Sequence, residues 1–139
     1  MKTIHKQKGK FVLRFDAGED VMDGLKNFGI AQKIKSAGFS AIGACGEVVL
    51  SFYNLKTKKY LDKNFAKNLE IVGLTGNLAW LGKEIIVHAH GLFSDKKMNV
   101  VGGHVKKLVV SATCEVIISV MDKKIIRRYD EKTGLNLMK

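Results

Sequence analysis

The sequence predicts an α+β fold, a mostly antiparallel β-sheet with one main N-terminal helix packed on it. Three observations predict it: one stretch with apolar residues at helical spacing, many segments rich in β-branched residues, and turn-forming residues between them. The chain contains no proline, so its turns must be made with Gly, Asn, Asp and Lys. Its 139 residues predict a single domain, residues 1–139, in which residues 1–9 form a basic leader.

The first strand and the helix are expected within the first forty residues. Phe11–Phe15 alternates apolar side chains with others, and Arg14 points to the opposite side from the core. Asp16–Asp20 supplies capping oxygens and acidic charge suited to a helix start. A helix is therefore predicted from about Glu19 to Lys35, and Gly38 is expected to end it. Its predicted core face carries Val21, Leu25, Phe28 and Ala31.

The rest of the chain is β-rich. Further strands are predicted at Phe39–Gly46, Glu47–Tyr53, Lys59–Phe65, Leu69–Trp80, Glu84–Phe93, Val100–Val105, Leu108–Val120 and Ile125–Tyr129. Residues 47–53 and 59–65 are expected to pair as a hairpin, and Leu108–Val120, the longest run, should be central. The small residues of Phe39–Gly46 indicate a very close neighbour, either a helix or another subunit. The tail around Leu135 and Leu137 is amphipathic enough to dock on the core.

Three of the four histidines, His88, His90 and His104, lie close together in the sequence. Residues i and i+2 of a strand share a face, so His88 and His90 point the same way, roughly 6.6 Å apart along the strand. If the polar segment Ser94–Asn99 closes a near-symmetric hairpin, His90 lies opposite His104, with Cβ atoms about 4.5–5.5 Å apart. The three imidazoles would then form an open tetrahedral metal site whose fourth position is left for water or a ligand.

Two interpretations of these histidines stay open at the level of sequence. They are either half-buried strand residues with nitrogens bonded to backbone or water, or they are metal ligands. Their spacing matches no standard zinc-finger pattern. Zinc is the expected metal, and imidazole also suits copper, iron and nickel.

The chain carries a formal net charge of +11, mostly from lysine. The charge gathers at both ends, at Lys2, Lys6, Lys8 and Lys10 and at Lys123, Lys124, Arg127 and Arg128. It is either a solvated surface or a surface for phosphate-rich partners such as DNA. No helix-turn-helix, zinc-finger or aromatic RNA-binding pattern is visible.

No membrane partner is expected, because no apolar run approaches the ~20 residues that span a bilayer. A basic start without a following apolar segment is not a signal peptide, so cytoplasmic residence is predicted. Cys45 and Cys114 lie in apolar, strand-like contexts and are expected to be buried free thiols.

The ordered motifs resemble those of the PPC (plants and prokaryotes conserved) domain family, from about Lys10 onward. The matching segments are Phe15–Val21, Phe39–Ala44, Glu70–Ile71, Leu74–Asn77, His88–His90, Gly102–His104 and Arg128–Leu135. Val105 follows Gly-Gly-His where the family usually has leucine, and this exchange is between apolar residues. No single motif identifies the family, but their order and spacing do so together.

The resemblance implies an α+β fold that assembles as a homotrimer. Plant members accompany AT-hook motifs in nuclear DNA-binding proteins, and single-domain prokaryotic members are often labelled DNA-binding by that analogy. Some members resemble metal-containing proteins, and their ligand positions correspond here to His88, His90 and His104. This chain has no Arg-Gly-Arg-Pro-like AT-hook core. Many plant members lack the histidines, so the metal site and the nuclear role are separable.

The alternative function is a metal-dependent hydrolase or lyase. Such an enzyme needs a metal-bound water and a positioned acid or base, for which Glu47 and Glu115 are the candidates. Arg14 and Asn77, with the same two glutamates, are candidates for hydrogen bonding to a metal-bound imidazole. Gly102–Gly103 indicates a tight backbone approach beside His104 rather than a phosphate loop. The sequence specifies no substrate and no DNA-contacting residue.

Overall fold

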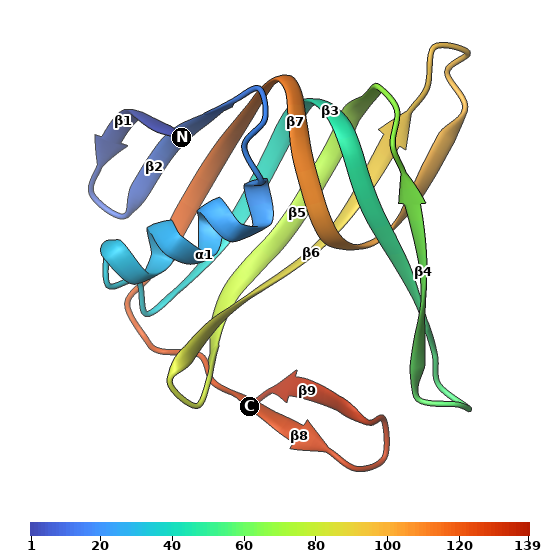
Figure 1. Ribbon diagram of the computed structural model, residues 1–139. Helices are drawn as coiled ribbons and strands as arrows, with labels where there is room; N and C mark the ends of the chain where they lie inside the picture. The colour runs from blue at the N-terminus through green and yellow to red at the C-terminus, as the bar shows by residue number, and fades with distance from the viewer.

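The structure is a computed structural model that describes residues 1–139, and it is dominated by strands (Figure 1). The strands are β1 (Lys2–Gln7), β2 (Lys10–Asp16), β3 (Ser36–Asn54), β4 (Lys59–Phe65), β5 (Leu69–Leu81), β6 (Glu84–Ser94), β7 (Val100–Met121), β8 (Arg127–Asp130) and β9 (Leu135–Met138). The one helix, α1, spans Val21–Ala31 and is too short to cross a bilayer. The prediction of a mostly antiparallel sheet with one helix near the N-terminus of the chain is confirmed.

Strand β7 organises the main sheet, whose order is β1-β2-β7-β6-β5-β3-β4. It pairs with β2, β3 and β6, and β3 and β6 in turn both pair with β5. These pairings, all antiparallel, close a ring through β3, β5, β6 and β7. The strand predicted to be central therefore is central, because its apolar positions face the core along most of its length.

The two longest strands were each predicted as two separate ones. Phe39–Gly46 and Glu47–Tyr53 are parts of β3, and Val100–Val105 and Leu108–Val120 are parts of β7. Register shifts between the two strands mark bulges, which bend a strand without ending it. The close neighbour of the small residues is strand β7, and not the helix or other subunit that was predicted, because a Cβ on Gly43 would lie 2.2 Å from the Thr113 carbonyl oxygen.

Helix α1 begins where predicted but ends earlier. The Asp20 carboxylate accepts from the backbone N–H groups of Met22 (2.8 Å) and Asp23 (3.1 Å), which caps the first turn. The helix ends at Ala31 rather than Lys35, and Gly38, the predicted terminator, lies inside β3. Pairing of residues 36–43 with β7 accounts for the difference, since tertiary pairing overrides local helix propensity. Val21, Leu25 and Phe28 are buried as predicted, whereas Ala31 is exposed.

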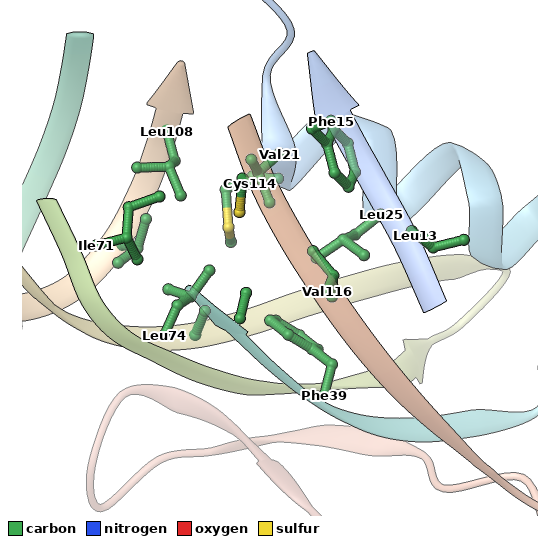
Figure 2. Close-up of a cluster of buried hydrophobic side chains, with 14 of the residues drawn as sticks. Leu13, Phe15, Val21, Leu25, Phe39, Ile71, Leu74, Leu108, Cys114 and Val116 are labelled. Atoms are coloured by element: carbon green, nitrogen blue, oxygen red, sulfur yellow. The ribbon is translucent and has the colours of Figure 1, made fainter. Parts of the chain in front are cut away.

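The hydrophobic core lies between α1 and the concave side of the main sheet (Figure 2). Figure 2 labels Leu13, Phe15, Val21, Leu25, Phe39, Ile71, Leu74, Leu108, Cys114 and Val116 in this cluster. Each large side chain buried there contributes roughly 1.5–3 kcal/mol. Gly24 lets the helix approach closely, because a Cβ there would lie 2.3 Å from the Phe15 ring. Cys45 and Cys114 are buried and free as predicted, and burial raises the pKa of these thiols to about 11 and about 12.

Both chain ends form a strand that was not predicted. The predicted leader contains β1, which pairs with β2 although its side chains are exposed. The tail contributes β9, which pairs with β8 in a separate two-stranded sheet. This β8–β9 hairpin lies apart from the core (Figure 1). The Tyr53 hydroxyl attaches the hairpin by donating to the Thr133 carbonyl (2.7 Å). Just before the hairpin, the Ile125 carbonyl accepts from the backbone N–H of Trp80 (2.9 Å).

Candidate metal centre

The three histidines predicted as a group converge in the folded chain. Antiparallel pairing of β6 with β7 sets His90 directly opposite His104, which confirms the predicted register, and His88 lies two residues before His90 on the same face. The ring centroids are 5.2–5.4 Å apart. One ring nitrogen of each histidine lies within 4.8 Å of the other two. Three imidazoles from two adjacent strands therefore share one focus.

The donor set fits a zinc-type ion. Zinc–nitrogen bonds of about 2.0–2.1 Å in a tetrahedral site place ligand nitrogens roughly 3.3 Å apart, so modest ring movements would complete the site. The group contains imidazole nitrogens and no carboxylate or thiol. Three neutral donors leave a fourth position for water or a ligand. A zinc ion bound there would supply Lewis acidity and lower the pKa of a bound water.

His88 lies against polar groups that keep it neutral. Asn77 faces it across the β5–β6 ladder, and a terminal nitrogen of Arg127 lies 3.4 Å from the His88 Nδ1 atom. The same nitrogen donates to the Asn77 side-chain oxygen at 2.8 Å. Burial is the main cause that lowers the pKa of His88, and the positive charges of Arg127 and His90 lower it further. A low pKa favours metal binding, because only the neutral imidazole is a ligand.

His104 is held in the neutral form more strongly. Burial is the main cause that lowers its pKa to about 4, followed by the neighbouring charges of His88, His90 and Lys106. The Tyr60 ring lies 5.4 Å from the His104 ring, centroid to centroid. His104 is therefore uncharged at neutral pH and available as a ligand.

Asn77 is the one proposed imidazole partner that lies beside the triad. Glu47 accepts instead from the Lys107 ammonium (2.9 Å). Glu115 is an exposed residue of β7 that pairs in register with Arg14, which binds Asp16. Neither glutamate belongs to the group of potential metal ligands, so the structure does not bring the predicted acid–base candidates to the histidines.

Arg127 is the important residue that the sequence reasoning missed. It was counted among the terminal surface charges, yet it is only 9% exposed. Its guanidinium donates to the Asn136 carbonyl (2.9 Å) and to Asn77, and its Nε atom is buried without a partner. Strand alternation was the available signal for the burial of one arginine, because Arg127 and Arg128 are adjacent in a strand and must face opposite sides. Arg128 is the one that faces outward.

A pocket of about 330 Å³ opens beside the triad, between the main sheet and the β8–β9 hairpin. Its nitrogen-bearing ionisable side chains are His88, His104 and Arg127, and no acidic residue lines it. The other lining residues are Tyr60, Leu81, Ile86, Val87, Gly134, Leu135, Asn136 and Leu137. The histidine focus therefore borders a small, largely apolar space.

Residues 3–122 match the model of the Plants and Prokaryotes Conserved (PCC) domain. The chain belongs to this family. The matched span includes β6, β7 and all three histidines, whereas the β8–β9 hairpin follows it. The family predicted from the motifs is thus confirmed, and no curated protein was found to match the sequence.

Three solved structures superpose closely on this one. A metal-containing protein of Archaeoglobus fulgidus is 30% identical, with a TM-score of 0.86 over 99% of this chain and 96% of its own. A Bacteroides thetaiotaomicron protein for which DNA binding has been suggested is 28% identical, with a TM-score of 0.94 over 97% and 94%. A plant- and prokaryote-conserved protein of Pyrococcus horikoshii is 26% identical, with a TM-score of 0.87 over 94% and 90%.

Proposed function

We propose that this PCC-domain protein binds a zinc-type metal ion through His88, His90 and His104 and acts in binding or regulation. The observation that carries the proposal is the convergence of three ring nitrogens within 4.8 Å of one another. The metal-containing relative from Archaeoglobus fulgidus, 30% identical over nearly the whole chain, supports it. The chain's own contribution is to bring three imidazoles close together beside a pocket that His88 and His104 help to line, and burial lowers the pKa of these two.

The metal content of the purified protein tests the proposal. We expect about one zinc per chain in the wild type, measured by inductively coupled plasma mass spectrometry after gel filtration. The triple variant His88→Ala, His90→Ala, His104→Ala should hold none. His5→Ala is the matched control, since His5 lies exposed on β1. Equal metal content in the triple variant and the wild type would refute the site.

The assembly that we propose is a homotrimer in the cytoplasm. Large apolar side chains on four strands of the main sheet are exposed in the single chain, namely Ile42, Val72, Leu92 and Ile117. Exposed apolar residues spread over one sheet are typical of a surface that another chain covers. Light scattering should give about 46 kDa, three times the 15.4 kDa of one chain. A mass of one chain would refute the trimer.

DNA binding is a second candidate function, favoured by one observation. The Val120 N–H donates to the Gly9 carbonyl (2.8 Å), which joins the β1–β2 turn to the end of β7. Lys6 consequently lines one hollow of about 380 Å³ together with Lys33 and Lys35, which are distant from it in sequence. Phosphate-rich partners bind such surfaces by counterion release.

Fluorescence anisotropy with a labelled duplex tests this candidate. Affinity should fall linearly with salt on logarithmic axes, with a slope set by the number of neutralised phosphates. The slope should be reduced in the variant Lys6→Gln, Lys33→Gln, Lys35→Gln. The matched control is the variant Lys56→Gln, Lys96→Gln, Lys97→Gln, which removes the same charge away from the hollow. Absence of binding at low salt would remove the candidate.

A further inference from the structure

We propose that the pocket between the β8–β9 hairpin and the histidines binds a small organic monocarboxylate, whose carboxylate group is held by Arg127. The inference deepens the proposed function and rests on it, because the carboxylate would reach the open position of the metal site. Four features of the molecule support it: the isolation of the Arg127 charge, the sign of the surrounding charges, the apolar walls and the size of the pocket.

Arg127 is a buried cation without an anion. No carboxylate lies within 4.0 Å of its guanidinium, which makes polar contacts only with the oxygens of Asn77 and Asn136 and, at 3.4 Å, the His88 Nδ1 atom. Its Nε atom is buried with no partner. A buried charge is costly unless it is paired and hydrogen-bonded, so the site lacks its counter-ion.

The surroundings of Arg127 favour an anion as the missing partner. His88 and His104 line the same pocket as neutral imidazoles, so the positive charge beside Arg127 would come from a metal ion on the triad. No Asp or Glu lines the pocket, so nothing there opposes a bound anion. Among anions, a carboxylate matches the planar guanidinium, which makes parallel N–H···O bonds to two oxygens.

The walls of the pocket fit an aliphatic group. Leu81, Ile86 and Val87 form the sheet side, and Leu135 and Leu137 form the hairpin side. A volume of about 330 Å³ is at the small end of the range for ligand pockets. The ligand class is therefore an acid of a few carbons rather than a nucleotide or a long-chain fatty acid.

Calorimetric titration of the metal-loaded full-length protein with butyrate and butanamide tests the inference. The two probes have the same shape and differ in charge. Butyrate should bind saturably and at least about tenfold more tightly than butanamide, because only a charged ligand gains from the guanidinium. Equal affinities, or no binding of butyrate, would overturn the inference.

Variants at two adjacent arginines locate the effect. Arg127→Gln should remove the preference for butyrate over butanamide, and Arg127→Lys should keep part of it, because lysine retains the charge but not the planar fork. Arg128→Gln is the matched control, since Arg128 is exposed on the same strand. A purely structural role for Arg127 would weaken both probes alike and leave their ratio unchanged, which would overturn the inference.

Metal content measured on the same samples separates the two proposals. Normal metal content without a butyrate preference refutes the carboxylate site alone. A wild-type protein that takes up no metal refutes the proposed function, and the carboxylate site is then judged on the metal-free protein. In the metal-free protein, Arg127 must still favour butyrate over butanamide, and equal binding of the two probes would refute the carboxylate site.

Discussion

The two sides of the main sheet are built from different interactions. On the α1 side, side chains from β2, β3, β5 and β7 form one continuous apolar cluster (Figure 2). On the histidine side, the β8–β9 hairpin is attached by a few polar bonds, among them those of Arg127, Tyr53 and Trp80. Apolar packing is therefore concentrated on one side of the sheet, and the candidate metal ligands lie on the other. Substitutions on the two sides should therefore have separable effects.

The largest effect on stability is expected from Phe15→Ala. The Phe15 ring is fully buried on the α1 side, and its removal leaves a cavity beneath the helix. We expect a loss of about 3–5 kcal/mol in the free energy of unfolding, measured by urea denaturation. The number of zinc ions bound per folded chain should be the same in Phe15→Ala as in the wild type. A loss below about 1 kcal/mol would show that the core is not concentrated there.

The next effect is expected from zinc on the opposite side. A ligand that binds only the folded state stabilises it, by about 2.7 kcal/mol when its free concentration is a hundred times Kd. We expect zinc to raise the urea midpoint of the wild type. The midpoint of the His88→Ala, His90→Ala, His104→Ala variant should not move, and magnesium, which prefers oxygen ligands, should have no effect on either. An equal rise in both proteins would place the zinc elsewhere.

An effect of similar size is expected from pH in the metal-free protein. His104 has a pKa of about 4 when folded and about 6.5 when unfolded. Between these values the unfolded chain binds a proton that the folded chain does not, so stability falls as pH decreases from about 6.5 to about 4. Denaturation curves at several pH values should show a shallower decline in His104→Ala than in the wild type. The control is His5→Ala. The same dependence of stability on pH in His104→Ala and in the wild type would contradict the buried, neutral state of His104.

The smallest effect is expected from Asp20→Ala at the start of α1. Loss of the two capping bonds should cost about 1 kcal/mol in the free energy of unfolding, without changing metal content. Asp23→Ala is the control, because Asp23 lies in the same turn and its side chain makes no capping bond. Equal losses in the two variants would show that charge near the helix start, rather than capping, matters.

Features that depend on local periodicity were predictable from the sequence. The pairing of His90 with His104 followed from strand alternation and a short polar turn, and both act over a few residues. The Asp20 cap and the burial of Phe11, Leu13 and Phe15 followed in the same way. The order of motifs sufficed to identify the family.

Features that depend on distant contacts were not predictable. The fusion of two predicted strands into β3, and again into β7, depends on bulges that the partner strand accommodates. Helix α1 ends at Ala31 because the following residues pair with β7, which lies some eighty residues away. The burial of Arg127 arises only when the β8–β9 hairpin folds back against Asn77. Strand alternation indicates only that Arg127 and Arg128 face opposite sides, and not which of the two meets Asn77.

X-ray absorption at the zinc edge of the zinc-loaded protein tests the central claim most directly, because it reports the atoms around the ion. We expect three imidazole nitrogens and one oxygen donor at about 2.0–2.1 Å from the zinc. The imidazole signal should be absent from the His88→Ala, His90→Ala, His104→Ala variant. Sulfur in the first shell, or a wild-type spectrum without imidazole scattering, would contradict the claim.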